Sequence, residues 1–346
     1  MGVIACVRDR VIHKPTIIYS YLYIGGAIVK ILLPQVHYFS AICILKMLRK
    51  LPAISPQIIG CSQSPQNMVN GGLLVDEYYV SPPLSDEGAY VSFLEKICRQ
   101  CSIDILISSD EDELKLLKKN EHLFQCLLVI PSLKILELFT DKLAASIEIN
   151  KLGIPIPQIY TDLCNVDKNR NSKIIFRKKT SVASQGIWIA DLNDNYIENH
   201  FSKDNFIQEY IGGYEYTVDV FCDKNGNMKL AVPRKRLDVR NGVTYKCQIE
   251  KNDSIIAACE TIYSHYNIPG FSNVQFKFQN GTPYFIELNP RFAGTGIASS
   301  LASFNIMLPF LEHFYYDKPL ESYEFYMGTV AWDSIITRFY EELISL

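Results

Sequence analysis

The sequence lacks several signals that assign a chain to a common class. It has no low-complexity tract and no internal repeat, so a repeat architecture is not indicated. It has no excess of basic charge, because 34 Lys and Arg side chains stand against 37 Asp and Glu, for a net charge of −3. General electrostatic attraction to nucleic acid is therefore not expected.

Two patterns of cofactor binding and catalysis are also missing. The turn after the first expected strand, residues 34–39, contains no G-x-G-x-x-G, so a dinucleotide site is not expected there. No Ser-His-Asp or Cys-His arrangement demands a covalent protein intermediate. His37 lies in this turn and is a candidate for substrate contact, although a lone His is more often structural.

The ten cysteines are scattered, and their one close pair is Cys98-Arg99-Gln100-Cys101. A single C-x-x-C without a second pair or a spaced His is a weak metal or redox signal. Several of the others lie in apolar runs, where Cys behaves as a small hydrophobe. We expect inert thiols in a reducing cytosol.

The N-terminus resembles a signal peptide or membrane anchor in outline, because basic side chains at residues 8–14 precede an apolar run at 16–29. The run is interrupted at Lys30, is short for a membrane span and lacks a convincing small-residue cleavage site. We therefore expect no stable membrane insertion. Residues 1–29 are predicted to be an extension, either an extra strand on the first domain or a weakly ordered segment.

With 346 residues, 48% of them hydrophobic, the chain is long enough for two or three domains. Short apolar runs alternate with helical stretches over residues 30–130, which predicts βαβ units and a mostly parallel sheet. The acidic run 110–113 fits a capping box at a helix start, and a metal cluster is the alternative. Strands are expected at 30–36, 57–61, 75–80 and 103–108, and helices at 39–51, 89–100 and from 109.

Residues 131–310 are predicted to form a second unit with antiparallel sheets. Its first helix, 141–152, is stopped by Gly153-Ile154-Pro155-Ile156-Pro157, and 130–140 is expected to be a linker. A hairpin over 273–288 turns at Asn280-Gly281. Residues 311–346 are expected to pack on this unit as a tail. The other elements expected are strands at 173–176, 186–190, 205–211, 215–222 and 228–233, and helices at 254–265 and from about 296.

The most informative stretch is Glu287-Leu288-Asn289-Pro290-Arg291, which follows an apolar run. Residues two apart share one face of a strand, so Glu287 and Asn289 would present oxygens side by side, with Arg291 nearby. Gln275 on the partner strand could add a third oxygen. Hard oxygen ligands beside a fixed cation suit a magnesium–phosphate centre.

At this point the chain resembles the ATP-grasp superfamily, and most closely the branch typified by the large subunit of carbamoyl phosphate synthetase. Five motifs occur in the expected order over about residues 30 to 310. The resemblance implies a pre-ATP-grasp domain at 30–130 and an ATP-grasp domain at 131–310. It also implies a mobile lid at about 157–205, whose closure would exclude water from an acyl phosphate.

The resemblance implies roles for basic residues around the ATP phosphates. Lys142 would reach the phosphates, and Arg177 would lie at the basic strand end, with Lys178 as its competitor. Many relatives have Pro after this residue and several glycines in the loop, whereas Lys178 and a Ser/Ala-rich loop at 180–186 stand here. The register of the lid therefore stays open.

The resemblance also implies how adenosine and metal would be held. Glu209 would contact the adenine amino group, Ile211 would offer its main-chain N–H and Glu215 would accept both ribose hydroxyls. The metal, Mg²⁺ or Mn²⁺, would bridge the ATP phosphates from Gln275, Glu287 and Asn289, and Arg291 would hold the acyl phosphate.

Residues 233–242 carry four cations in seven residues, at 234, 235, 236 and 240, which suggests an anion-binding edge. Arg binds carboxylates through bidentate contacts, so Arg236 and Arg240 are the candidates for the substrate carboxylate. A solvated basic hairpin is the alternative.

These residues lead to the expectation of an ADP-forming carboxylate–amine ligase in the cytoplasm. ATP would convert a small-molecule carboxylate to an acyl phosphate, which an amine or similar nucleophile would attack. A kinase that phosphorylates a small-molecule hydroxyl and a non-catalytic ATP-binding subunit are the alternatives. A homodimer is possible, and the identity of the substrates does not follow from the sequence.

Overall fold

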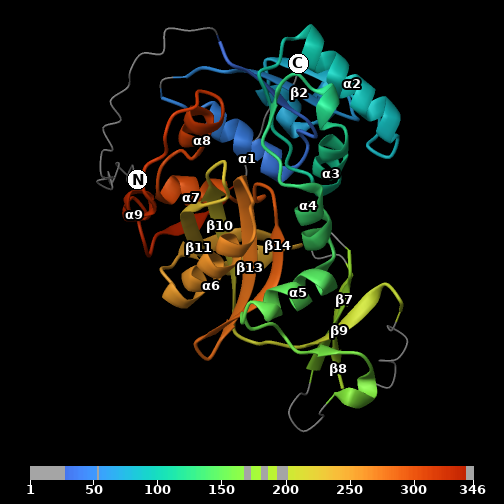
Figure 1. The fold of residues 1–346 in the computed structure, drawn as a ribbon, viewed down its shortest axis with the longest axis vertical. Helices are drawn as coiled ribbons and strands as arrows, with labels where there is room; N and C mark the ends of the chain where they lie inside the picture. Colours follow the sequence, from blue (N-terminus) through green and yellow to red (C-terminus); the bar gives the residue numbers. More distant parts are fainter. Residues whose placement is uncertain (1–27, 53, 167–172, 181–185, 193–201, 340–346) are drawn as a thin grey trace, which may run out of the picture.

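The computed structural model describes residues 28–52, 54–166, 173–180, 186–192 and 202–339, and every structural statement below concerns these. They form three sheets: one parallel sheet and two antiparallel ones (Figure 1). The predicted fold class, a parallel α/β part followed by antiparallel sheets, is confirmed. The predicted N-terminal extension falls almost wholly outside the described residues.

The first unit, called here the parallel-sheet domain, has five parallel strands in the order β3-β2-β1-β4-β5. The chain leaves β1 toward β2 on one side, and β4 later pairs on the other side. In such sheets the carboxyl ends of the strands at this switch point border a ligand crevice. The elements are β1 Lys30–Leu33, α1 Phe39–Leu48, β2 Gln57–Ser62, η1 Gln66–Met68, η2 Asn70–Leu74, β3 Glu77–Val80, α2 Glu87–Gln100, β4 Ile105–Leu106, α3 Glu111–Lys119, η3 Glu121–Leu123 and β5 Leu127–Leu128.

Several predicted bounds in this part of the chain were wrong in detail, among them the strand expected at 103–108, which is only Ile105–Leu106. β1 ends at Leu33 rather than 36, because Pro34 follows and Gln35 takes a positive φ of 51°. The expected linker at 130–140 contains a helix, α4 Leu133–Thr140, whose N-cap Ser132 accepts a hydrogen bond from the Ile135 N–H. α4 descends from the parallel-sheet domain to the antiparallel part (Figure 1).

The antiparallel part consists of a four-stranded small sheet, in the order β6-β9-β7-β8, and a six-stranded large sheet, in the order β14-β13-β10-β11-β12-β15. The hairpin β13–β14 turns at Asn280 and Gly281, with φ of 51° and 80°, as the Asn-Gly signal predicted. The bounds are α5 Lys142–Lys151, β6 Ile159–Tyr160, η4 Leu163–Asn165, β7 Lys173–Lys178, β8 Ile187–Asp191, β9 Asn205–Glu209, β10 Tyr214–Cys222, β11 Met228–Arg240, β12 Val243–Ile249, α6 Asp253–His265, β13 Gly270–Gln279, β14 Thr282–Asn289, α7 Ile297–Ala302, α8 Met307–Phe314, α9 Tyr323–Gly328 and β15 Ile335–Thr337.

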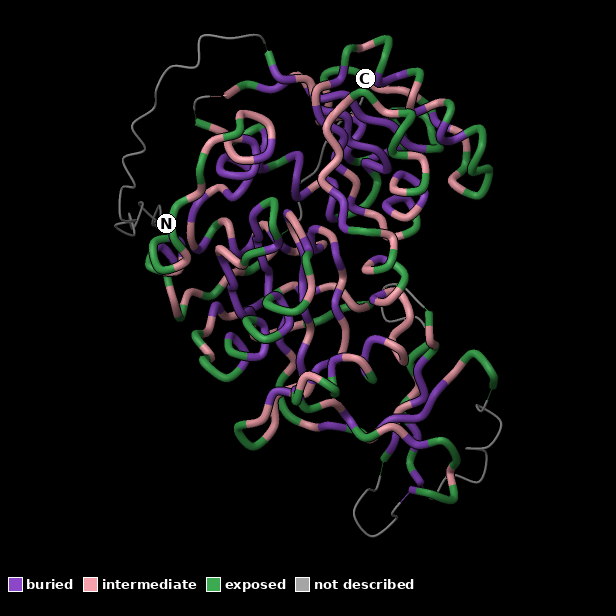
Figure 2. Tube along the Cα trace, in the orientation of Figure 1, coloured by how far each residue is buried: buried purple, intermediate pink, exposed green. Residues whose placement is uncertain are grey.

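The two faces of the large sheet are buried differently. One face packs against α5 and α6 in a hydrophobic cluster that includes Val218, Val274 and Phe285. The opposite face is apolar only at one end, where Phe221 and Leu230 join α8 and the parallel-sheet domain in a single cluster. Its other end is polar, which leaves room for a site. Figure 2 shows the buried residues along the central strands and the exposed ones in the marginal loops.

Within the described residues, no helix is both long and apolar enough to cross a membrane.

The predicted capping box at the start of α3 is only half formed. The Asp110 carboxylate accepts a hydrogen bond from the Glu113 N–H at 2.9 Å. The Glu113 side chain does not return the bond and instead accepts from the hydroxyls of Tyr90 and Ser108, fully buried. Burial raises the pKa of Glu113 to about 7, against the opposing effect of the hydrogen bonds from Ser108 and Tyr90.

This raised pKa predicts a pH-dependent stability. Between about pH 4.5 and 7, Glu113 is protonated in the folded state and ionised in the unfolded chain. The stability that Glu113 contributes is therefore fully present below about pH 4.5 and is lost as the pH rises through 7. As the pH rises from 4.5 to 8, the wild type should lose about 3 kcal/mol of free energy of unfolding relative to Glu113→Gln, which has no proton to lose at this position. Urea unfolding at several pH values measures this. Glu121→Gln, at an exposed carboxylate, is the control, and parallel profiles for Glu113→Gln and the wild type would contradict the assignment.

Candidate active site

A cavity of about 460 Å³ lies where the three sheets meet. The small sheet contributes side chains of β7, β8 and β9, and the large sheet contributes the polar end of β10, β13 and β14. The parallel-sheet domain contributes the starts of α1 and α3 and the residues just before them, which follow β1 and β4. Convergence of several elements on a partly polar cavity is typical of a ligand site.

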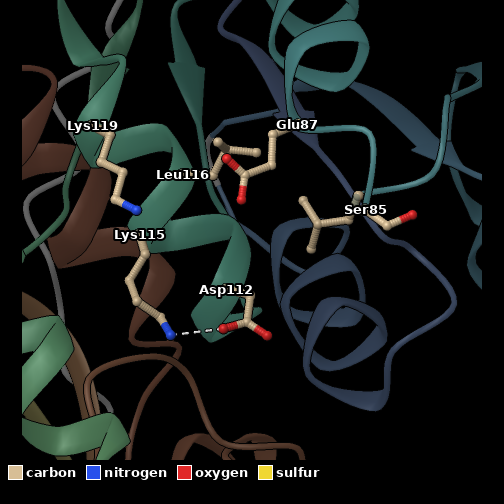
Figure 3. A pocket seen from close by; sticks show the side chains of 7 residues that line it. Ser85, Glu87, Asp112, Lys115, Leu116 and Lys119 are labelled. Carbon is tan, nitrogen blue, oxygen red and sulfur yellow. Dashed lines mark ion pairs between the residues drawn. The ribbon is translucent and has the colours of Figure 1, made fainter.

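A smaller cleft of about 380 Å³ lies in the parallel-sheet domain, between the loop before α2 and α3 (Figure 3). Its ion pair is Lys115–Asp112 at 2.7 Å, with 73% of the Asp112 side chain exposed. Such a pair contributes little energy. This cleft is therefore a weaker candidate than the cavity between the sheets.

The predicted metal-binding hairpin brings its three oxygen-bearing residues together. Gln275 on β13 pairs with Glu287 on β14, and Asn289 is two residues further along the same strand. Ile286 is an extra residue in the ladder, which forms a β-bulge. As a result Phe285 and Leu288 both enter the core, although they are three apart, while Gln275, Glu287 and Asn289 all line the cavity.

Glu287 is the centre of charge in the cavity. Its Oε2 lies 3.4 Å from Lys142 Nζ and 3.5 Å from Arg177 Nη2, and its Oε1 accepts a bond of 3.4 Å from the Asn289 amide. Burial acts to raise the pKa of Glu287, but Lys142 and Arg177, together with Asn289 and Arg291, lower it below its ordinary value. Glu287 is therefore a charged carboxylate at neutral pH.

The amide of Asn289 is oriented by Asn273, a residue that the sequence analysis missed. Asn289 Nδ2 donates to Asn273 Oδ1 at 3.0 Å, and Asn273 Nδ2 donates to the Arg291 carbonyl at 3.1 Å. This turns the Asn289 nitrogen toward Asn273 and its oxygen away from it. Strand alternation with Gln275 was the signal that could have identified Asn273.

The donor chemistry around Glu287 fits a hard divalent cation. One ionised carboxylate and two amides are oxygen donors of the kind that Mg²⁺ binds, with water and phosphate completing its shell. Among the described residues, no group of three His, Cys, Asp or Glu side chains could hold a metal. The set here differs because Gln275 and Asn289 contribute amides. The acidic run 110–113 does not form the alternative metal cluster.

The structure distinguishes Arg177 from Lys178. Arg177 is 3% exposed and donates from Nη1 to Gln208 Oε1 and to the Ile286 carbonyl, both at 3.1 Å. Burial lowers the pKa of Arg177, and Glu287 and Glu215 oppose this. Lys178 is exposed, and of the two only Arg177 lines the cavity in the described structure. Residues 181–185 of the predicted lid loop lie outside the described residues.

The small sheet also presents a buried group without a partner. Gln208 is 1% exposed and lines the cavity, and its Nε2 has no hydrogen-bond partner among the described residues. A buried amide without a partner is costly, and a ligand in the cavity could satisfy it.

The three predicted hinge residues all line the cavity. Glu209 ends β9, and its Oε2 accepts from the Gln158 N–H at 3.4 Å. Ile211 is buried two residues later. Glu215 is already paired, with the Arg236 guanidinium and with Lys277 Nζ at 3.5 Å.

The predicted anion-binding edge is the second half of β11. Arg236 donates to Glu215, to Thr244 Oγ1 at 2.8 Å and to the Gly242 carbonyl at 2.7 Å, so it is held within the cavity wall. Arg240 is 60% exposed at its side chain and pairs with Asp238 at 3.0 Å. Of these two arginines, only Arg236 is among the described residues that line the cavity.

His37 lies near the cavity but is not among its lining residues in the described structure. Its Nδ1 shares a hydrogen bond of 2.9 Å with Ser62 Oγ. Burial lowers the pKa of His37, against an opposing effect of Asp110. The neighbouring Tyr38 does line the cavity.

Arg234 is a structural residue rather than an open anion site. Its side chain is fully buried, binds both oxygens of Asp219 at 2.7 and 2.9 Å and donates to Thr295 Oγ1 at 2.9 Å. Ser299 donates to the same Asp219 carboxylate. This network joins β10 and β11 to α7 and to Thr295 just before it.

Arg291 has a partner that the sequence did not suggest. Its Nη2 lies 2.9 Å from Oε1 of Glu111, the first residue of α3. The acidic run was interpreted as a capping box at a helix start, with a metal cluster as the alternative, and neither interpretation singled out Glu111. The position of Glu111 after β4, at the switch point of the parallel sheet, was the available signal.

Comparisons with known proteins agree with this arrangement. A family model described as "ATP-grasp in the biosynthetic pathway with Ter operon" matches residues 201–327. Comparison with curated protein sequences gave no match.

Three solved structures share the fold. The biotin carboxylase domain dimer of Hydrogenobacter thermophilus 2-oxoglutarate carboxylase, in complex with magnesium ADP, ADP and bicarbonate, has a TM-score of 0.64 and 15% identity, covering 90% of this chain and 74% of that one. Staphylococcus aureus N5-carboxyaminoimidazole synthetase with ADP has a TM-score of 0.65 and 13% identity, covering 85% of this chain and 79% of that one. The L-amino acid ligase of Bacillus licheniformis has a TM-score of 0.63 and 15% identity, covering 86% of this chain and 76% of that one. Identities of this size show a shared fold.

The buried Arg234–Asp219 pair predicts a large stability effect. Asp219→Ala would leave the Arg234 charge buried without its partner, at a cost of about 3–5 kcal/mol in free energy of unfolding. Asp238→Ala removes the exposed Arg240–Asp238 pair on β11, the strand of Arg234, and should cost at most about 1 kcal/mol. Urea unfolding of both variants measures the difference. Equal losses would show that the Arg234–Asp219 pair does not have this role.

Proposed function

We propose, from the premise that this chain has the fold of the ATP-grasp superfamily, that it is an ADP-forming ligase that joins a small-molecule carboxylate to an amine. The observation that carries the proposal is the ionised Glu287, flanked by Asn289 and Gln275 and surrounded by Lys142, Arg177 and Arg291. Binding a nucleotide alone does not require this complete set. Assignment to the carbamoyl phosphate synthetase branch remains a prediction.

Each chemical step then has residues to support it. In the first step a substrate carboxylate oxygen attacks the γ-phosphorus of ATP, the bond to the β-phosphate oxygen breaks and ADP leaves. Lys142 and Arg177 neutralise the charge on the transferring phosphoryl group. In the second step the nucleophile attacks the acyl carbon and phosphate leaves, with Arg291 holding the acyl phosphate. Most of the catalysis is positioning and charge neutralisation.

The metal would be held by Gln275, Glu287 and Asn289, with Asn273 keeping the amide of Asn289 in orientation. Mg²⁺, or Mn²⁺, would supply Lewis-acid neutralisation of the phosphate oxygens when bound. Lys142 and Arg177 pair with Glu287 in the described structure, so they keep this carboxylate charged without the metal.

The small sheet would hold the nucleoside. Glu209 and the Ile211 N–H would contact adenine, Glu215 would bind the ribose, and the free amide nitrogen of Gln208 gives the ligand a further donor. We propose that Arg236 orients Glu215 rather than the substrate, because its donors are engaged with Glu215, Thr244 and Gly242. Arg240 and His37 would contact substrate only if they approach the cavity on lid closure.

The experiment that tests the proposal is a panel of carboxylates and amines. Release of ADP and phosphate is measured for each pair, and the products are identified by mass spectrometry. A substrate-dependent release of both, with an amide product, supports the ligase. A stable phosphorylated product without any need for an amine would contradict it.

A cytoplasmic homodimer remains a proposal, and light scattering after size-exclusion chromatography measures the oligomeric state.

Glu287→Ala should lower turnover by at least about 100-fold, because it removes the charged oxygen donor at the centre of the site. The fold should persist, because the buried Arg177 keeps its hydrogen bonds to Gln208 and to the Ile286 carbonyl. ADP release and the urea midpoint are measured together. Glu148→Ala, an exposed carboxylate on α5, is the control. Turnover like that of the wild type in Glu287→Ala would refute the assignment.

Arg177→Met should weaken ATP binding by about 10- to 150-fold, the equivalent of a charged hydrogen bond of about 1.5–3 kcal/mol. Lys178→Met is the matched control, because its side chain lies outside the cavity lining, and should change the affinity less than about threefold. Titration calorimetry with ATP measures both. Similar losses in the two variants would show that Arg177 is not the phosphate ligand.

A further inference from the structure

Glu111 is an acidic residue of the cavity that the proposed reaction has not used. It comes from the parallel-sheet domain, whereas its partner Arg291 follows β14 of the large sheet, and the pair bridges the two units at 2.9 Å. Only 13% of the Glu111 side chain is exposed, and it lines the cavity.

The structural needs of α3 are met by the other members of the acidic run. Asp110 caps the helix through the Glu113 N–H, Glu113 accepts from Tyr90 and Ser108, and Asp112 pairs with Lys115 outside the cavity. A carboxylate at the position of Glu111 is favoured by the helix dipole, but the dipole does not require it to enter the cavity. The needs of the helix therefore do not explain why the Glu111 side chain points toward Arg291, and a functional explanation is required.

The surroundings of Glu111 make it a good proton acceptor. Burial raises the pKa of Glu111, and the carboxylates of Glu287 and of Asp110, on its own element, raise it further. The cations Arg291 and Lys142 act in the opposite direction. A carboxyl group of raised pKa in a cavity is a frequent property of groups that exchange protons with a substrate.

We propose that Glu111 binds the nucleophile in its ammonium form beside Arg291 and accepts its proton. This inference rests on the proposed function. Arg291 would hold the acyl phosphate, so a nitrogen held by Glu111 would lie next to the acyl carbon. The nucleophile is accordingly a basic amine, cationic at neutral pH, rather than an alcohol or water.

The ammonium gives one proton to the Glu111 carboxylate, and its freed electron pair forms the C–N bond to the acyl carbon. The C–O bond to phosphate breaks, and the phosphate leaves with that electron pair. The second proton of the attacking nitrogen goes to the departing phosphate, so the products are the amide, hydrogen phosphate and protonated Glu111.

Glu111→Gln tests the inference, because it keeps the size of the side chain and removes the charge. Hydroxylamine, which is largely unprotonated at neutral pH, traps an acyl phosphate without help from a base. L-Alaninamide and methylamine, which are more basic, are the amine probes, and a panel of L-amino acids and dicarboxylic acids supplies the carboxylate. Hydroxamate formation and amide formation are measured side by side, with the KM for each amine.

The expected result is a hydroxamate rate within about threefold of the wild type and a loss of amide formation of at least about 100-fold, the scale of one proton-transfer group. Asp112→Asn, an exposed carboxylate one residue further along α3, should match the wild type in both assays. Persistent hydroxamate formation also shows that Glu111→Gln is folded.

Other results have distinct meanings. Parallel loss of hydroxamate and amide would mean that Glu111 acts only by holding Arg291, and unchanged amide formation would mean that it has no role; either overturns the inference. A wild type that forms hydroxamate but no amide with either amine also overturns it. A wild type that forms no hydroxamate from any carboxylate contradicts the proposed ligase itself.

Discussion

The site depends on one balance of charge, between the Glu287 carboxylate and the cations around it. A buried carboxylate is costly unless it is paired, and here Lys142 and Arg177 approach the same oxygen from two different elements. The pairing lowers the pKa of Glu287 and keeps it charged. It also ties the small sheet and α5 to the large sheet at the point where chemistry is proposed.

The fold makes this balance possible because one face of the large sheet has an apolar end and a polar end. At one end of that face Phe221 and Leu230 are buried with α8 and the parallel-sheet domain, and at the other end β13 and β14 expose their polar residues to the cavity. The bulge at Ile286 lets Phe285 and Leu288 enter the core without turning Glu287 away from the cavity. The buried Arg234–Asp219 pair joins β10 to β11.

The local parts of this arrangement could be predicted from the sequence. The Asn280-Gly281 turn and the alternation of Glu287 and Asn289 depend on neighbours along the chain, and both were confirmed in position. The shared fold of the solved structures and the family model over residues 201–327 agree with the superfamily resemblance. Contacts between distant segments could not be predicted: Glu111 meets Arg291 only through the sheet topology, and Arg236 is engaged because β10 and β12 both pair beside β11. α4 was missed because its short pattern resembled a linker.

The most direct test of the account is a crystal structure of this chain with Mn²⁺ and a non-hydrolysable ATP analogue, in which anomalous scattering locates the metal. The account predicts a metal peak about 2.0–2.3 Å from oxygens of Glu287 and of Asn289 or Gln275, shared with the phosphates of the analogue. Phosphates bound away from these residues, or a metal that none of them contacts, would contradict it.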